Sequence, residues 1–97
     1  MRLPLSAKQR TLQVHVGSIL YDYTDGQATV EACGKDLVSL LADLERRHPG
    51  LRFRVVDEQD QVRPHIHLFV GGRPVRDLSG PLGEATEVHI LGALSGG

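Results

Sequence analysis

Four histidines fall in segments whose residues alternate between apolar and polar, a pattern typical of β-strands with one buried face. They are His15, His65, His67 and His89. If these strands are neighbours, the four imidazoles share the outer face of one sheet with Phe69 and Leu91. Neutral imidazole is a good ligand for zinc and nickel. The simpler interpretation is a solvated face rich in histidine, since no carboxylate is evident as a partner of the rings. We therefore predict no bound metal.

The end of the sequence offers a different kind of chemistry. The segment Gly92-Ala93-Leu94-Ser95-Gly96-Gly97 directly follows a predicted strand, and Gly97 supplies a terminal carboxylate. Glycine has no Cβ, so its backbone can enter a narrow active site. A segment of such small residues is expected to stay mobile until a partner orders it. The terminal carboxylate is the candidate reactive group.

Two other groups are weaker candidates for chemistry. Cys33 is predicted on the outer side of a strand, but no histidine is near it in the sequence to activate a thiol. Asp57, Glu58 and Asp60 could form a carboxylate cluster or a metal site. They lie in a polar stretch beside arginines, where a solvated turn is the simpler interpretation.

One amphipathic helix is the clearest element that could position these groups. Asp36 is a plausible N-cap, because its carboxylate can accept hydrogen bonds from the first-turn amides. Arg46 and Arg47 suit the negative end of the helix dipole, and Pro49-Gly50 ends the helix. The apolar stripe follows the i, i+3, i+4, i+7 spacing of a buried helix face: Leu37, Leu40, Leu41 and Leu44.

Alternation predicts strands on both sides of this helix. They are expected at residues 11–16, 28–33, 65–70 and 87–91, and a short return strand is expected at 73–76 after the hairpin turn. Asp25-Gly26 marks the turn of the first hairpin, and Gly71-Gly72 is a two-residue hairpin signal. Residues 51–63 are interpreted as a loop with a short ordered piece.

The order of these elements predicts an α+β fold, in which one mixed sheet buries one face against the leucine stripe of the helix. This is the β-grasp, or ubiquitin-like, architecture. The 97 residues are enough for one small domain. We expect a flexible extension over residues 1–10, the β-grasp domain over 11–91 and a flexible tail over 92–97.

The composition excludes several classes of protein. Eleven Lys and Arg against twelve Asp and Glu give a net charge of −1, which disfavours nucleic acid as a partner. A single cysteine excludes an internal disulfide and a cysteine-based zinc site. No apolar run approaches the length of a membrane span, and the N-terminus lacks a signal-peptide core. We expect a cytoplasmic protein without a membrane partner.

From about Leu12 to Gly97 the sequence resembles the MoaD/ThiS family of sulfur-carrier proteins, and within it the CysO-type carriers of actinobacteria. The similarity rests on the leucine helix opened by Gly34-Lys35-Asp36 and on the hairpin Ile66-His67-Leu68-Phe69-Val70-Gly71-Gly72. It rests most on the terminal Gly96-Gly97 directly after a final strand. A Gly-Gly end is a weak signal alone and a strong one after a β-grasp pattern.

The resemblance implies a protein cosubstrate rather than an enzyme. A ubiquitin-activating-type adenylyltransferase (MoeB/ThiF-like) would adenylate the Gly97 carboxylate with ATP and Mg²⁺, and sulfur would then displace AMP to give a thiocarboxylate. The thiocarboxylate would deliver sulfur to a biosynthetic enzyme that makes cysteine, a cofactor or a sulfur-containing natural product. The chain itself would hold no cofactor.

The resemblance also suggests which residues meet the activating enzyme. Residues Gly92, Ala93, Leu94, Ser95 and Gly96 would thread into its active site. We interpret Phe69, Leu91, His67 and His89 as the patch that docks on it, since exposed apolar residues beside polar ones mark such surfaces.

Two other functions remain possible at this point. A ubiquitin-like modifier, joined through Gly97 to lysines of other proteins, would share the fold, the tail and the activation step. A small metal-dependent enzyme that uses the histidines is the least supported, because the sequence shows no nucleophile–base pair and no phosphate loop.

Overall fold

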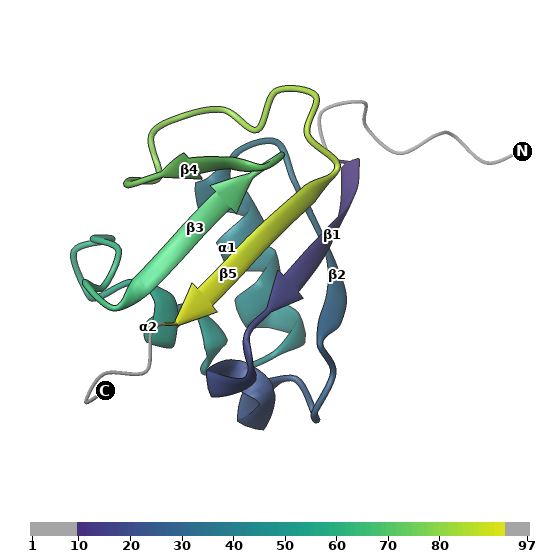
Figure 1. Ribbon diagram of the computed structural model, residues 1–97, viewed down its shortest axis with the longest axis vertical. Helices are drawn as coiled ribbons and strands as arrows, with labels where there is room; N and C mark the ends of the chain where they lie inside the picture. Colours follow the sequence, from purple (N-terminus) through teal and green to yellow (C-terminus); the bar gives the residue numbers. More distant parts are fainter. Residues whose placement is uncertain (1–9, 93–97) are drawn as a thin grey trace, which may run out of the picture.

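Five strands form one mixed sheet in the order β2-β1-β5-β3-β4, and helix α1 packs across one face of it (Figure 1). The computed structural model describes residues 10–92. Strands β1 and β5 lie side by side and parallel, and every other pair is antiparallel. The strands are β1 (Arg10–Val16), β2 (Thr29–Gly34), β3 (Ile66–Val70), β4 (Arg73–Val75) and β5 (Glu87–Gly92). The helices are a 3₁₀ helix η1 (Ser18–Tyr23), α1 (Leu37–Arg47) and α2 (Leu51–Val55). The β-grasp prediction is confirmed.

Helix α1 begins where the sequence predicts. The Asp36 carboxylate accepts a hydrogen bond from the Ser39 amide at 2.8 Å, and Ser39 Oγ accepts one from the Asp36 amide at 3.2 Å. This reciprocal capping box satisfies two amides that the first turn leaves without partners. The hydrogen bonds from the Ser39 amide and hydroxyl lower the pKa of Asp36. All four leucines of the predicted stripe are buried.

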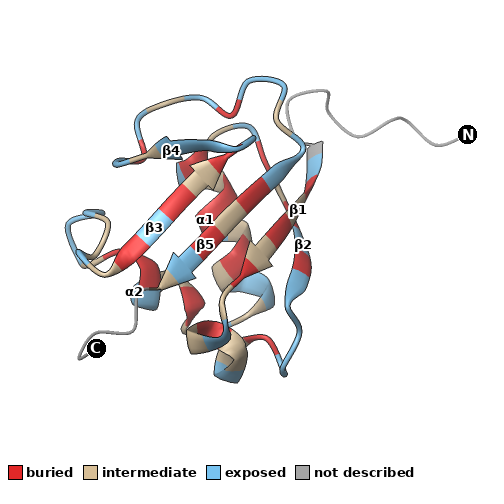
Figure 2. Ribbon diagram, in the orientation of Figure 1, coloured by how far each residue is buried: buried red, intermediate tan, exposed pale blue. Residues whose placement is uncertain are grey.

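The leucine stripe packs on the inner face of the sheet. Burial alternates along β3 and β5, so that every second side chain enters the core (Figure 2). Val14 pairs with Val88, and Leu68 pairs with Ile90, so inward positions of neighbouring strands coincide. This register joins the strands and α1 into one core and points the intervening side chains outward.

The strand boundaries differ from the prediction by one residue at six places, because β2 also ends at Gly34, β3 begins at Ile66 and β4 ends at Val75. Arg10, assigned to the extension, pairs with Gly34 in β1, and Gly92, assigned to the tail, pairs with Ile66 in β5. Ala28 is exposed, and β2 begins at Thr29. Alternating apolar residues mark the middle of a strand, whereas the terminal pairs depend on backbone hydrogen bonds that carry no sequence pattern. Residues 1–9 and 93–97 lie outside the described residues.

The segment assigned to a loop contributes to the core. In α2, Leu51 and Val55 are buried one helical turn apart, and Phe53 between them is exposed. Val56 follows in the core and forms an isolated bridge with Val62. The short ordered piece is therefore a helix that packs against α1 and η1 and adds two side chains to the core. None of the helices among residues 10–92 has the length and apolar character to cross a membrane.

Candidate docking face and carrier end

The four residues predicted to dock on an activating enzyme lie together. Phe69 in β3 is opposite His89 in β5, and His67 is opposite Leu91. We call these four residues the outer patch. Leu91 is 38 % exposed, one of three large apolar side chains among residues 10–92 that are this open to solvent. The antiparallel register of β3 and β5 thus assembles a contiguous surface of two apolar and two imidazole side chains.

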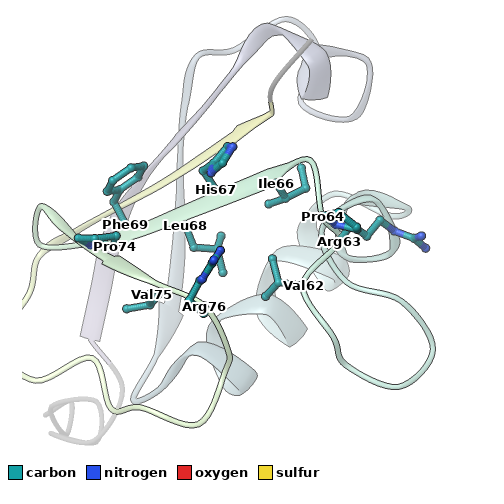
Figure 3. Close-up of a pocket in the computed structure, with 10 residues that line it drawn as sticks. All are labelled: Val62, Arg63, Pro64, Ile66, His67, Leu68, Phe69, Pro74, Val75 and Arg76. Atoms are coloured by element: carbon teal, nitrogen blue, oxygen red, sulfur yellow. The ribbon is translucent and has the colours of Figure 1, made fainter. Parts of the chain in front are cut away.

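A groove borders the outer patch along the edge of β3. The short strand β4 pairs only with residues Leu68–Val70, so the first half of β3 has no strand on that side. A cavity of about 310 Å³ opens there, and His67 and Phe69 form part of its wall (Figure 3). Arg76 lines the same cavity and makes no hydrogen bond or ion pair with the described residues. An open strand edge beside a cation suits a polar or acidic segment of a partner.

The described chain ends next to the outer patch. Strand β5 closes with Leu91 and Gly92, and the Gly17 amide donates to the Ile90 carbonyl at 3.0 Å just before this end. A Cβ at Gly92 would lie 2.6 Å from Ile19 Cγ2, so this position is packed against η1. The predicted tail residues Ala93, Leu94, Ser95, Gly96 and Gly97 lie outside the described residues. Five residues reach at most about 18 Å from Gly92 when extended.

The structure brings two of the four sheet histidines into contact. His15 and His89 are opposite each other on β1 and β5, and their rings stack with centroids 4.5 Å apart. His67 lies across from Leu91, and His65 precedes β3. A cluster of four imidazoles does not form.

The sequence interpretation missed a carboxylate on this face. Glu87 Oε1 lies 3.3 Å from His15 Nε2, so the expectation that no carboxylate accompanies these rings is wrong. The sequence does contain a signal for this carboxylate, because Glu87 precedes His89 by two residues and therefore projects from the same face of the strand. The spacing of residues in the sequence does not reveal the register of β1 against β5, and this register is what places His15 beside Glu87 and His89.

Cys33 belongs to the scaffold rather than to a reactive site. Its sulfur is half-buried, 3.5 Å from Thr11 Oγ1 and 3.6 Å from Arg47 Nη2. Its amide donates to the Asp43 carboxylate at 2.8 Å. Burial acts to raise the pKa of Asp43, but this hydrogen bond and those from Arg46 and Arg47 lower it overall. Asp43 therefore ties α1 to β2.

The acidic segment is a turn, as predicted. The Asp57 carboxylate accepts hydrogen bonds from the Gln61 amide at 3.0 Å and the Gln59 amide at 2.8 Å, which lower the pKa of Asp57. Asp60 adopts a left-handed conformation with φ 61° and pairs with Arg52. Asp57 is thus bound within the turn and Asp60 is bound to α2, and the acidic residues of this segment do not form a metal-ligating group.

Taken together, the fold and the outer patch define a ubiquitin-like β-grasp protein. No protein-family model matches the chain. The sulfur carrier protein CysO of Mycobacterium tuberculosis is 30% identical over 89 residues, which cover 87% of this chain and 96% of that protein. The chain belongs to this family of CysO sulfur carrier proteins.

Solved structures agree with this assignment. The complex of BexX and CysO from Amycolatopsis orientalis matches with a TM-score of 0.80 and 30% identity, over 89% of this chain and 99% of that one. The small archaeal modifier protein 1 (SAMP1) from Methanosarcina acetivorans matches with a TM-score of 0.74 and 20% identity, over 92% of this chain and 98% of that one. The second likeness shows the shared fold alone.

Proposed function

We propose that this chain carries sulfur as a thiocarboxylate on Gly97. The terminal carboxylate attacks the α-phosphorus of ATP bound with Mg²⁺ in an activating enzyme, and pyrophosphate leaves. A sulfide-level donor then attacks the carbonyl carbon of the acyl-adenylate, the bond to AMP breaks, and the thiocarboxylate remains. Sulfur passes from there to an acceptor bound in a second enzyme. The observation that carries the proposal is the match to CysO sulfur carriers over nearly their whole length.

The chain serves in this reaction as a cosubstrate and not as the catalyst. Its described cysteine is tied into the scaffold by Thr11 and Arg47, Asp36 caps α1, and Asp57 holds a turn. The chemistry is supplied by the activating enzyme, which must take in the end of the chain. Gly96 and Gly97 favour that entry because they add no side-chain bulk.

The length of the tail limits where the proposed activating enzyme can dock. Its adenylation site lies within about 18 Å of Gly92, the reach of the five residues that follow. The outer patch adjoins Gly92 through Leu91 and meets this requirement. Phe69 and Leu91 supply apolar contact, and His67, His89 and Arg76 supply polar groups at the rim. We propose a MoeB/ThiF-like adenylyltransferase as the enzyme that covers this surface.

A second partner receives the sulfur. The Amycolatopsis relative was solved as a complex of CysO with BexX. By analogy, we propose that this chain docks on a sulfur-accepting biosynthetic enzyme through the same end. Both partners are proteins of the cytoplasm in this proposal, where ATP is available for activation, and neither nucleic acid nor membrane is required.

The intact mass of the chain tests the proposal directly. The chain is expressed together with its activating enzyme, supplied with a sulfur source and analysed by mass spectrometry. We expect a mass increase that corresponds to one sulfur replacing one oxygen, located on Gly97 by fragmentation. A chain that lacks Gly96 and Gly97 is the matched control and stays unmodified. Sulfur on the control, or an unmodified full-length chain that the enzyme adenylates, would contradict the proposal.

The same experiment separates the carrier from a modifier. If Gly97 were joined to lysines of other proteins, covalent products of higher mass would form and would disappear with the terminal glycines. A thiocarboxylate without such products supports the carrier.

A further inference from the structure

The sequence predicts no bound metal, but the carboxylate of Glu87 changes the basis of that prediction, and we propose that His15, Glu87 and His89 form a binding site for a divalent transition-metal ion, with Zn²⁺ as the fitting ion. One nitrogen from each histidine and one oxygen of Glu87 lie within 4.8 Å of one another. The three residues come from the two central strands of the sheet, β1 and β5, and all project from its outer face. Imidazole and carboxylate are ligands that Zn²⁺ accepts, and three protein ligands leave one position for water.

His15 is held as a metal ligand would be. Its Nδ1 lies 3.1 Å from Thr29 Oγ1 on the neighbouring strand β2. A histidine that binds metal through one nitrogen almost always uses the other in a hydrogen bond, which fixes the tautomer and the ring orientation. With Nδ1 engaged by Thr29, Nε2 is the nitrogen that faces Glu87 and His89.

The Nε2 atom of His15 lacks a partner of its own. It is shielded from solvent and makes no hydrogen bond with the described residues. Glu87 Oε1 is 3.3 Å away but lies off the direction of the ring nitrogen, so that a direct hydrogen bond does not form. A buried nitrogen without a hydrogen bond is unfavourable, and a shared cation would satisfy both the nitrogen and the carboxylate.

The distance between His15 Nε2 and Glu87 Oε1 also fits two ligands of one metal ion. Two ligand atoms that each lie about 2.1 Å from a zinc ion, in tetrahedral geometry, are about 3.4 Å apart. The His15 and Glu87 atoms are already at this spacing. Strands β1 and β5 fix the backbones, and Glu87 is an exposed side chain that can adjust. The His89 ring, which now stacks on His15, completes the site by turning about its side-chain bonds.

The metal site can be tested separately from the docking proposal. His89 belongs to both, because it lies between His15 on one side and Phe69 on the other. Metal binding is measured on the purified chain and needs no activating enzyme, so it holds or fails apart from sulfur transfer.

Calorimetric titration of the purified full-length chain with ZnCl₂, after treatment with a chelator, tests the site. We expect saturable binding of one ion per chain. Removal of a residue that only orients a metal ligand weakens binding about 10–100-fold, so Glu87→Gln and His89→Gln should each weaken it at least as much. His67→Gln is the matched control on the same face and should leave the affinity unchanged. Thr29→Val, which keeps the branched side chain and removes the His15 partner, should weaken binding by about tenfold.

A second measurement reports the ligand geometry. Cobalt(II) added to the unmodified chain should give the intense visible absorption of a tetrahedral site, and Glu87→Gln should abolish it. Circular dichroism checks that each variant is folded. Absence of saturable zinc binding would overturn the proposal and leave a plain contact between His15 and Glu87. Equal loss of affinity in His67→Gln would also overturn it, since binding would then be spread over the histidines of the face.

Discussion

The two faces of the sheet differ in how strictly their side chains are fixed. On the inner face, Leu12, Val14, Val88 and Ile90 are fully buried and meet the leucines of α1. On the outer face, their neighbours along the strands are half-buried or exposed, and most carry amide, imidazole or carboxylate groups. The same strands thus serve two tasks, because side chains alternate between the faces. The inner face determines the fold, and the outer face is free for the partner and the ion proposed above.

Because the two faces differ in this way, we expect mutations on the inner face to change stability and mutations on the outer face to change function. A change on the inner face removes packing that no other element can replace. A change on the outer face leaves the core intact and alters what the molecule contacts. Paired substitutions, one on each kind of surface, test this separation.

The largest effect is expected from Leu40→Ala in α1. Leu40 is fully buried against the sheet, and such truncations lower the free energy of unfolding by about 2–5 kcal/mol. Val38→Ala on the same helix is the control, because Val38 is 49% exposed and its change should stay within about 0.5 kcal/mol. Urea denaturation measures both. Similar losses in the two variants would contradict the assignment of the buried face.

The next effect is expected at the outer patch. Phe69→Glu should weaken binding to the activating enzyme at least tenfold, about 1.4 kcal/mol, because it places a charge in an apolar contact. Isothermal titration calorimetry measures the affinity. Phe53→Glu is matched in chemistry and lies on α2, where Phe53 packs against the Arg63 guanidinium rather than in the patch.

Phe53→Glu should bind the enzyme like the unchanged chain, and both variants should unfold at similar urea concentrations. Equal affinity of Phe69→Glu and the unchanged chain would place the docking surface elsewhere.

A smaller effect is expected at the N-terminus of α1. Asp36→Ala removes the acceptor for the Ser39 amide and should lower the free energy of unfolding by about 1 kcal/mol. Asp22→Ala, at an exposed aspartate of η1, is the control and should change it little. Thermal denaturation followed by circular dichroism compares the two. No difference between them would mean that the cap contributes nothing to stability.

The smallest effect concerns acidification. The pKa values of Asp36 and Asp43 are lowered in the folded chain, from an ordinary value of 3.8. Their contribution to stability is therefore fully present above about pH 5 and decreases as the pH falls through 3.8 toward the folded pKa values. The urea midpoint should decrease from pH 5 to pH 3. The double variant Asp36→Asn with Asp43→Asn should show a weaker decrease, and an unchanged decrease would assign the effect to other carboxylates.

Much of the scaffold could be predicted from local pattern. The leucine spacing and Asp36 specify α1, and alternation specifies the middle of four strands. Helix α2 was not predicted, because Leu51, Phe53 and Val55 alternate with polar residues as in a strand. In the structure, Leu51 and Val55 are buried and Phe53 is exposed. A helix of five residues contains too few turns for a helical period to be recognised in the sequence.

The outer face could be predicted only in part. The outward positions of Phe69, His67, His89 and Leu91 follow from alternation, and their adjacency follows from the expected strand order. The contact between His15 and Glu87 depends on the register of two strands more than seventy residues apart. Alternation sets which face a residue occupies, but it does not set which residue of a distant strand lies beside it.

In the proposed function, the last carboxylate is the reactive group and the rest of the chain presents it to the activating enzyme. Deletion of Gly97 moves that carboxylate back by about 3.5 Å and leaves the outer patch unchanged. This variant should still bind the activating enzyme but should no longer support exchange of pyrophosphate into ATP. Exchange at the rate of the unchanged chain would contradict the claim.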